Sequence, residues 1–152
     1  MNIPSFLRES RQEILTDAAA SVKRAHLQHY EQAGADTTRQ RLDDLLSLTI
    51  NAVEERNLAP MVAHANAVAQ ARFEGGIDLA EVQTAFNVLE EAVWLRILKH
   101  LPSTEQAEAL GLVGTVLGAG KDALARKYVS LASQTRVPSL NLQALFSGTD
   151  GN

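Results

Sequence analysis

Apolar residues recur every three or four positions along almost the whole chain, which is the spacing of one helix face. The clearest stretch is residues 79–97, where two neighbouring apolar rows indicate a wide buried face. No stretch alternates between apolar and polar residues as a half-buried strand does. The pattern therefore predicts an all-α protein, a single-domain bundle of about five helices.

Turn and capping residues place the first two helices. The first is predicted over residues 5–33, with Gly34 as its stop and with a kink allowed by its length. The second begins in the segment DTTRQ, residues 36–40, whose first three side chains can all cap a helix. It ends in the segment EERN, residues 54–57.

The next two helices have clearer boundaries. The third carries Pro60 in its first turn, where the missing N–H costs nothing, and ends at the glycine pair 75–76. The fourth begins at Asp78, and Glu81 follows three residues later as in a capping box. Its wide apolar face predicts a central helix with neighbours on several sides.

The fifth helix opens after Pro102, and its spacing from Ser103 to Gln106 predicts a second capping box. It is predicted to reach about Ser133. In the segment that follows, LNLQALF is apolar enough for a short docked helix or a partner-binding segment. We therefore expect a helical sensor or regulatory domain over residues 1–135 and a tail over residues 136–152.

Residues 111–122, GLVGTVLGAGKD, resemble a phosphate-binding loop at first sight. Such a loop needs a glycine where this chain has Thr115, and a hydroxyl for magnesium where it has Asp122. A carboxylate at the second position would repel a triphosphate. The glycines therefore need another explanation.

Gly111, Gly114 and Gly118 follow one another at helical spacing and share one face of the fifth predicted helix. A glycine inside a helix costs about 1 kcal/mol relative to alanine, so three on one face indicate a packing role. The interpretation is that another helix approaches closely there, as at small-residue packing faces. That helix belongs either to the same chain, which we favour, or to a second subunit.

Composition limits the classes of function. The 152 residues carry a net charge of −4 with both signs interspersed, and no basic stripe predicts nucleic-acid binding. The chain has no cysteine, which excludes disulfides and thiolate catalysis. The start has no signal-peptide pattern, and no apolar run approaches the ~20 residues that span a bilayer. A soluble cytoplasmic protein without membrane association is the expectation.

Few residues suggest a site. The histidines lack the spacing of zinc and di-iron motifs, and no catalytic set can be assembled from the sequence, so we predict neither a metal site nor an enzyme. A ligand pocket is predicted near Tyr30, Arg72 and Trp94, where a guanidinium can clamp a carboxylate or phosphate. His64 joins this set as a conceivable haem ligand, although no cofactor is predicted.

The segment ARFEGGIDLAEVQTAFNVLEEAVWLRIL, residues 71–98, resembles the N-terminal domain of RsbR-type (RsbRD) co-antagonists of the bacterial stressosome. The resemblance covers residues 10–133 and implies a sensory domain that precedes an output module, as similar domains precede histidine kinases. Relatives of RsbR imply a globin-like dimer without haem. The residues that carry the resemblance are Arg72, Gly75 or Gly76, Leu79, Glu81 and Val82.

Two functions follow from these observations. The first is a non-enzymatic regulatory domain that forms a homodimer and contacts a signalling partner in trans, a STAS-type or kinase output module. The chain leaves no room for an output module after residue 133, so we expect it to act alone or as one piece of a longer protein. The alternative is a small-molecule sensor with a pocket between its helices.

Overall fold

The computed structural model describes residues 2–136, which form seven helices and no β-strand. The predicted all-α class is therefore confirmed. The first predicted helix is divided into three, which accounts for the two extra helices. In chain order the helices are α1 (Ile3–Glu9), α2 (Arg11–Ala25), α3 (Gln28–Ala33), α4 (Ala35–Glu55), α5 (Ala59–Glu74), α6 (Leu79–His100) and α7 (Ser103–Arg136).

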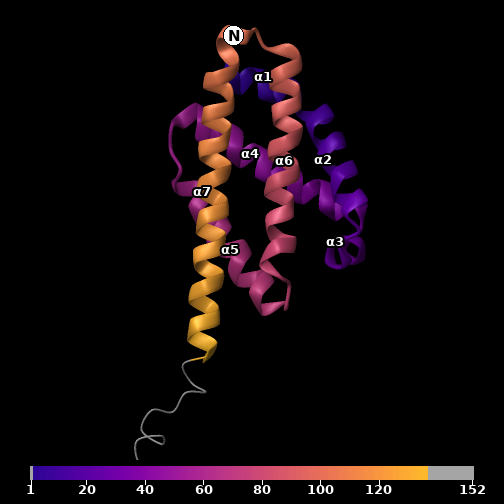
Figure 1. The fold of residues 1–152 in the computed structure, drawn as a ribbon, viewed down its shortest axis with the longest axis vertical. Coiled ribbons are helices and arrows are strands. Elements are labelled where there is room, and N and C mark those ends of the chain that lie inside the picture. The colour runs from indigo at the N-terminus through magenta and orange to yellow at the C-terminus, as the bar shows by residue number, and fades with distance from the viewer. Residues whose placement is uncertain (1, 137–152) are drawn as a thin grey trace, which may run out of the picture.

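The two longest helices, α6 and α7, lie side by side as an antiparallel pair, and α4 crosses behind them (Figure 1). α2 packs against α6 and α4, α5 packs along α7, and α1 lies on α4. α7 has 34 residues and α6 has 22, so α7 is about 18 Å longer at 1.5 Å per residue. Its C-terminal part extends beyond the rest of the bundle (Figure 1).

The predicted helix over residues 5–33 is wrong as a single element. The chain turns at Ser10, and α2 ends before His26, which caps it with a left-handed φ of 52°. Neither break contains the glycine or proline that usually marks a helix end. The helical spacing of apolar residues therefore continues across both breaks and does not reveal them. The first break sets α1 against α4, where it buries Ile3, Phe6 and Leu7.

The predicted caps of two helices also differ from the structure. α4 is preceded by Gly34 as its N-cap, so none of residues 36–38 has that role. Asp78 is the N-cap of α6 as predicted, but its side chain makes no capping hydrogen bond. The Glu81 carboxylate binds His29 of α3 instead of completing a box.

α7 begins at Ser103 as predicted and continues to Arg136, three residues past the predicted end. Gln106 does not complete a capping box. Its side-chain amide donates to the backbone oxygens of Leu98 (3.3 Å) and Leu101 (3.1 Å), which lie at the C-terminal end of α6. The amide therefore caps the preceding helix. The predicted docked segment LNLQALF lies outside the described residues.

The apolar row of α6 forms the centre of the core as predicted, with five residues of this row buried. The second row is buried at Val88 and Ala92, whereas Leu95 is exposed. Tyr128 of α7 closes one end of the core, because its hydroxyl donates to the backbone oxygen of Ile77 at 2.8 Å. The buried residues of the main row are Val82, Phe86, Leu89, Val93 and Ile97.

Candidate functional site

A cavity of about 210 Å³ lies between α3, α4, α5 and α6 and is open to solvent. We call it the pocket. One wall is a ridge of α5, in which His64, Val68 and Arg72 follow one another four residues apart and so share one face. α4 contributes Arg41, α3 contributes Tyr30, and α6 supplies an apolar floor. The pocket therefore combines two cations with apolar walls.

Neither the Arg41 side chain nor the Arg72 side chain makes a hydrogen bond or an ion pair with another described residue. Both side chains are partly buried. Burial lowers the pKa of the Arg41 guanidinium, and the positive charge of Arg72 lowers it further. Two guanidinium groups thus face the same cavity and repel each other.

Tyr30 and His64 are the neutral polar groups of the pocket. Burial raises the pKa of the Tyr30 phenol, which keeps its proton in place, and the charges of Arg72 and Arg41 oppose this shift. Burial lowers the pKa of the His64 imidazole, the charge of Asp44 raises it, and that of Arg72 lowers it. At neutral pH both side chains are therefore uncharged groups with a proton to donate.

Two carboxylates lie close to the arginines, yet both have other partners. Asp44 lines the pocket and accepts a hydrogen bond from the Gln40 side-chain amide at 2.9 Å. Glu81 accepts from the backbone N–H of His29 at 3.2 Å, and its second oxygen lies 2.5 Å from Nδ1 of the same histidine. Neither carboxylate forms an ion pair with the pocket arginines.

A second feature is the surface that α6 and α7 turn away from the core, which we call the outer face. On α6 it carries Trp94, which is 44% exposed, and Leu98, which is 52% exposed. Spacings of three and four place these two residues in line with Asn87 and Glu91. The corresponding row of α7 is Gly111, Thr115, Gly118 and Asp122.

The glycines of the outer face have no close neighbours. A Cβ atom placed on Gly111 or Gly118 would meet no atom within 4 Å, and one on Gly114 would meet only the Glu90 carboxylate at 3.7 Å. The favoured internal explanation, close packing of these glycines within the chain, does not describe this structure. Close packing occurs instead at Gly120, where a Cβ would lie 2.7 Å from the Phe86 ring.

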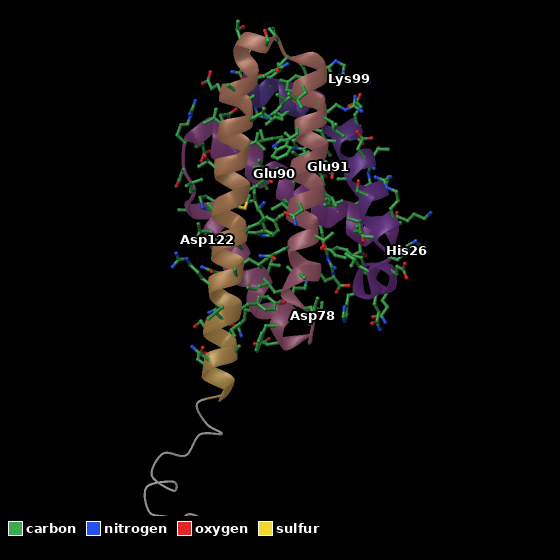
Figure 2. All side chains as sticks on the ribbon, viewed as in Figure 1. His26, Asp78, Glu90, Glu91, Lys99 and Asp122 are labelled. Atoms are coloured by element: carbon green, nitrogen blue, oxygen red, sulfur yellow. The ribbon has the colours of Figure 1, made fainter. Side chains whose placement is uncertain are left out.

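Polar contacts join the two helices beside the outer face. Lys121 of α7 lies 3.1 Å from the Glu90 carboxylate and 3.3 Å from the Asn87 side-chain oxygen, both of α6. Glu90 lies between the two long helices, whereas Glu91 is exposed, so the adjacent carboxylates form no pair (Figure 2). These contacts fix α6 and α7 as one surface.

A comparison with protein families matched residues 4–136 to the RsbT co-antagonist protein rsbRD N-terminal domain. The chain belongs to this family. The resemblance seen in residues 71–98 is thereby confirmed, and the match covers all seven helices except the first residue of α1. This RsbRD N-terminal domain is accordingly of a stressosome-type signalling family. No curated protein and no solved structure matched the chain.

The domain brings together three of the four residues predicted for a pocket. Tyr30, His64 and Arg72 line the same cavity, although they come from two different helices. Trp94 is placed elsewhere, because it belongs to the outer face and not to the pocket. The predicted globin-like arrangement is untested, since no solved structure was matched.

Sequence reasoning missed Arg41. The signal was present, because Arg41 lies three residues after buried Thr38 and four before buried Leu45. A charged residue in the buried row of an amphipathic helix indicates either a partner or a cavity. The same reasoning applies to Arg72, which continues the buried row of α5 three residues after Ala69.

Two further observations limit the kind of site in the RsbRD N-terminal domain. Over residues 2–136, the structure contains no group of three or more histidine, aspartate or glutamate side chains able to hold a metal ion. No helix in the same range has the length and apolar character needed to cross a bilayer.

Proposed function

We propose that this RsbRD N-terminal domain is a non-enzymatic cytoplasmic signalling domain that forms a homodimer through the outer face of α6 and α7. The proposal rests on one observation, the exposed Trp94 and Leu98 beside a row of glycines that nothing covers. Signal would pass by contact to an output protein in trans, a STAS-type or kinase module. Family membership supports the signalling role.

The physical argument for a second copy concerns Trp94 and the glycines together. A tryptophan buries 150–250 Å² when covered, and it is among the residues that most often dominate interface energies. Gly111 and Gly118 present bare backbone, which lets an opposing helix approach closely. In a two-fold dimer the same patch serves both subunits, so Trp94 of each copy would cover the glycines of the other.

Solution mass tests the dimer. Light scattering over a range of concentrations should give twice the 16.4 kDa chain mass. Trp94→Ala should weaken the dimer roughly 1,000-fold, because the variant removes two interface hot spots, one from each copy, at about 2 kcal/mol each. Gly118→Leu should also weaken it, because the added side chain holds the helices apart.

The matched control is Leu58→Ala, which removes an exposed apolar side chain 38% accessible in the α4–α5 loop. It should leave the mass unchanged. A monomer at every concentration, or equal effects of all three variants, would contradict this interface. Folding of each variant is checked by circular dichroism.

The second candidate function is a small-molecule sensor, and the pocket is the observation that favours it. Tyr30, His64 and Arg72 lie together as a sensing site requires. The pocket's 210 Å³ is below the 300–1,000 Å³ typical for drug-sized ligands, and haem is larger than such ligands. The size therefore argues against haem and favours a smaller ligand.

A further inference from the structure

The arginines of this chain differ in whether they have a partner. Over residues 2–134, every arginine side chain outside the pocket makes a hydrogen bond or an ion pair. Arg41 and Arg72 make none with a described residue, although both are partly buried and face one cavity. The arginines that have a partner are Arg8, Arg11, Arg24, Arg39, Arg56, Arg96 and Arg126.

We propose that the pocket binds a small organic oxyanion, a carboxylate- or phosphate-bearing metabolite, between the guanidinium groups of Arg41 and Arg72. This inference deepens the sensor candidate and rests on it, whereas it is independent of the dimer. Four side chains contact this ligand, and two of them are Arg41 and Arg72. The other two side chains are Tyr30 and His64.

Charge is the first argument. Two like charges in a partly desolvated cavity repel each other, and an anion between them turns repulsion into two attractions. A guanidinium offers five N–H donors in a planar fork that matches a carboxylate or a phosphate. The chain's own nearby carboxylates, Asp44 and Glu81, are bound to Gln40 and His29. Neither carboxylate forms an ion pair with Arg41 or Arg72, so an anion from outside can make that direct contact.

Shape is the second argument. The volume of about 210 Å³ is below the roughly 300–1,000 Å³ of sites for drug-sized ligands, which favours a small metabolite. Val68, Val82 and Phe86 are among the apolar lining residues, so part of the ligand is hydrocarbon. A charged head at the arginines and an apolar body against α6 would fill the space.

The neutral donors are the third argument. The Tyr30 hydroxyl keeps its proton because burial raises its pKa, so it can donate to an anion. His64 faces Asp44 of α4 and Arg72 of its own helix, and Tyr30 and Arg41 line the same pocket from α3 and α4. A bound anion would raise the pKa of His64, which makes binding stronger at mildly acidic pH.

The test is calorimetric titration of the full chain with inorganic phosphate and with succinate, at an ionic strength held constant with sodium chloride. We expect saturable binding of at least one probe, and the tighter of the two identifies the head group. Arg41→Gln and Arg72→Gln should each weaken binding about tenfold or more, since each removes charge-assisted hydrogen bonds. Arg24→Gln, an exposed arginine of α2, should leave it unchanged.

Folding of the variants is separated from binding by thermal unfolding without the probe. There, Arg41→Gln should be at least as stable as the parent protein, because it removes a repulsion. The absence of saturable binding by both probes would overturn the proposal. Equal weakening by Arg24→Gln would overturn it as well, because only non-specific charge would then be involved.

The dimer constant and the hydrogen-exchange pattern, each measured with and without the probe, distinguish the site from the sensor function. Probe binding that also changes the dimer constant supports both. Probe binding with an unchanged dimer constant and an unchanged hydrogen-exchange pattern supports the oxyanion site and contradicts its role as a sensor. If neither probe binds, the oxyanion site is contradicted, whereas the proposed dimer is unaffected.

Discussion

Gly120 is the residue at which α7 comes closest to the core. A Cβ there would lie 2.7 Å from Cε2 of Phe86 and 3.0 Å from Sδ of Met61, and both side chains are buried. The absence of a side chain is therefore what allows α5 and α6 to meet α7 at this level. Packing, and not backbone conformation, requires the glycine.

Gly120→Ala should lower the free energy of unfolding by about 1 kcal/mol. Overpacking costs about 1–3 kcal/mol, and higher helix propensity returns up to about 1 kcal/mol. Gly111→Ala, with open space around it, should instead stabilise the monomer by up to about 1 kcal/mol. Urea unfolding at low protein concentration measures both, and stabilisation by both variants would contradict the close packing.

His64 should make stability depend on pH. Burial lowers the pKa of its imidazole in the folded state below the ordinary value of 6.5, so the unfolded chain binds the proton more readily. The contribution to stability is complete above about pH 6.5 and is lost as the pH falls toward the folded pKa. His64→Gln should flatten the stability curve below pH 6.5, whereas the exposed His100→Gln should not.

The pocket shows how far single residues could be predicted. Tyr30, His64 and Arg72 were selected for their chemistry, and the fold places them together. Trp94 was selected on the same grounds but is exposed, because an apolar face wider than the core leaves its edge in solvent. Arg41 was missed, since its neighbour in space, Arg72, lies 31 positions away along the chain. The types of residue at the site could be predicted from the sequence, but the distances between their side chains could not.

At the scale of elements, α3 has the weakest attachment to the core. It has six residues, none of which is buried. Its polar anchor to α6 is Glu81, which binds the backbone and ring of His29. Tyr30, one residue further, forms part of the pocket wall and packs on the core when α3 is in place.

Glu81→Ala should release α3 without unfolding the bundle. Amide exchange should accelerate over residues 28–33, because the local opening energy loses a charge-assisted contact, whereas exchange in α4 and α7 should not change. Glu91→Ala, an exposed carboxylate of the same helix, is the control. Unchanged exchange in α3 would show that Tyr30 alone holds it.

Most of the helices were predictable because their apolar rows are long and their ends are marked. α5 has Pro60 in its first turn and the 75–76 glycine pair at its end, and α6 has the widest apolar face. The breaks at Ser10 and His26 were not predictable, since each depends on what the next helix packs against. The two capping boxes failed because Glu81 and Gln106 bind neighbouring helices, and tertiary contacts override local signals.

At the scale of the whole molecule, the pocket and the outer face use different sides of α6, because Val82 and Phe86 line the pocket whereas Trp94 and Leu98 are exposed. α5 turns His64 and Arg72 toward the pocket. α7 turns Gly111 and Gly118 away from the core. The two proposed functions therefore occupy different surfaces. Trp94→Ala and Gly118→Leu change the outer face alone, whereas Arg41→Gln and Arg72→Gln change the pocket alone.

The close fit at Gly120 also bears on mechanics. Met61 of α5 lies against α7 at Gly120. The same helix, α5, carries Arg72 three turns later. A close-packed contact of this kind resists gradual sliding, since any shift forces side chains into new positions. Any ligand that pulls α5 toward itself must therefore carry α7 along or break that contact. The contact at Gly120 therefore couples the position of α5 at the pocket to the position of α7 at the outer face.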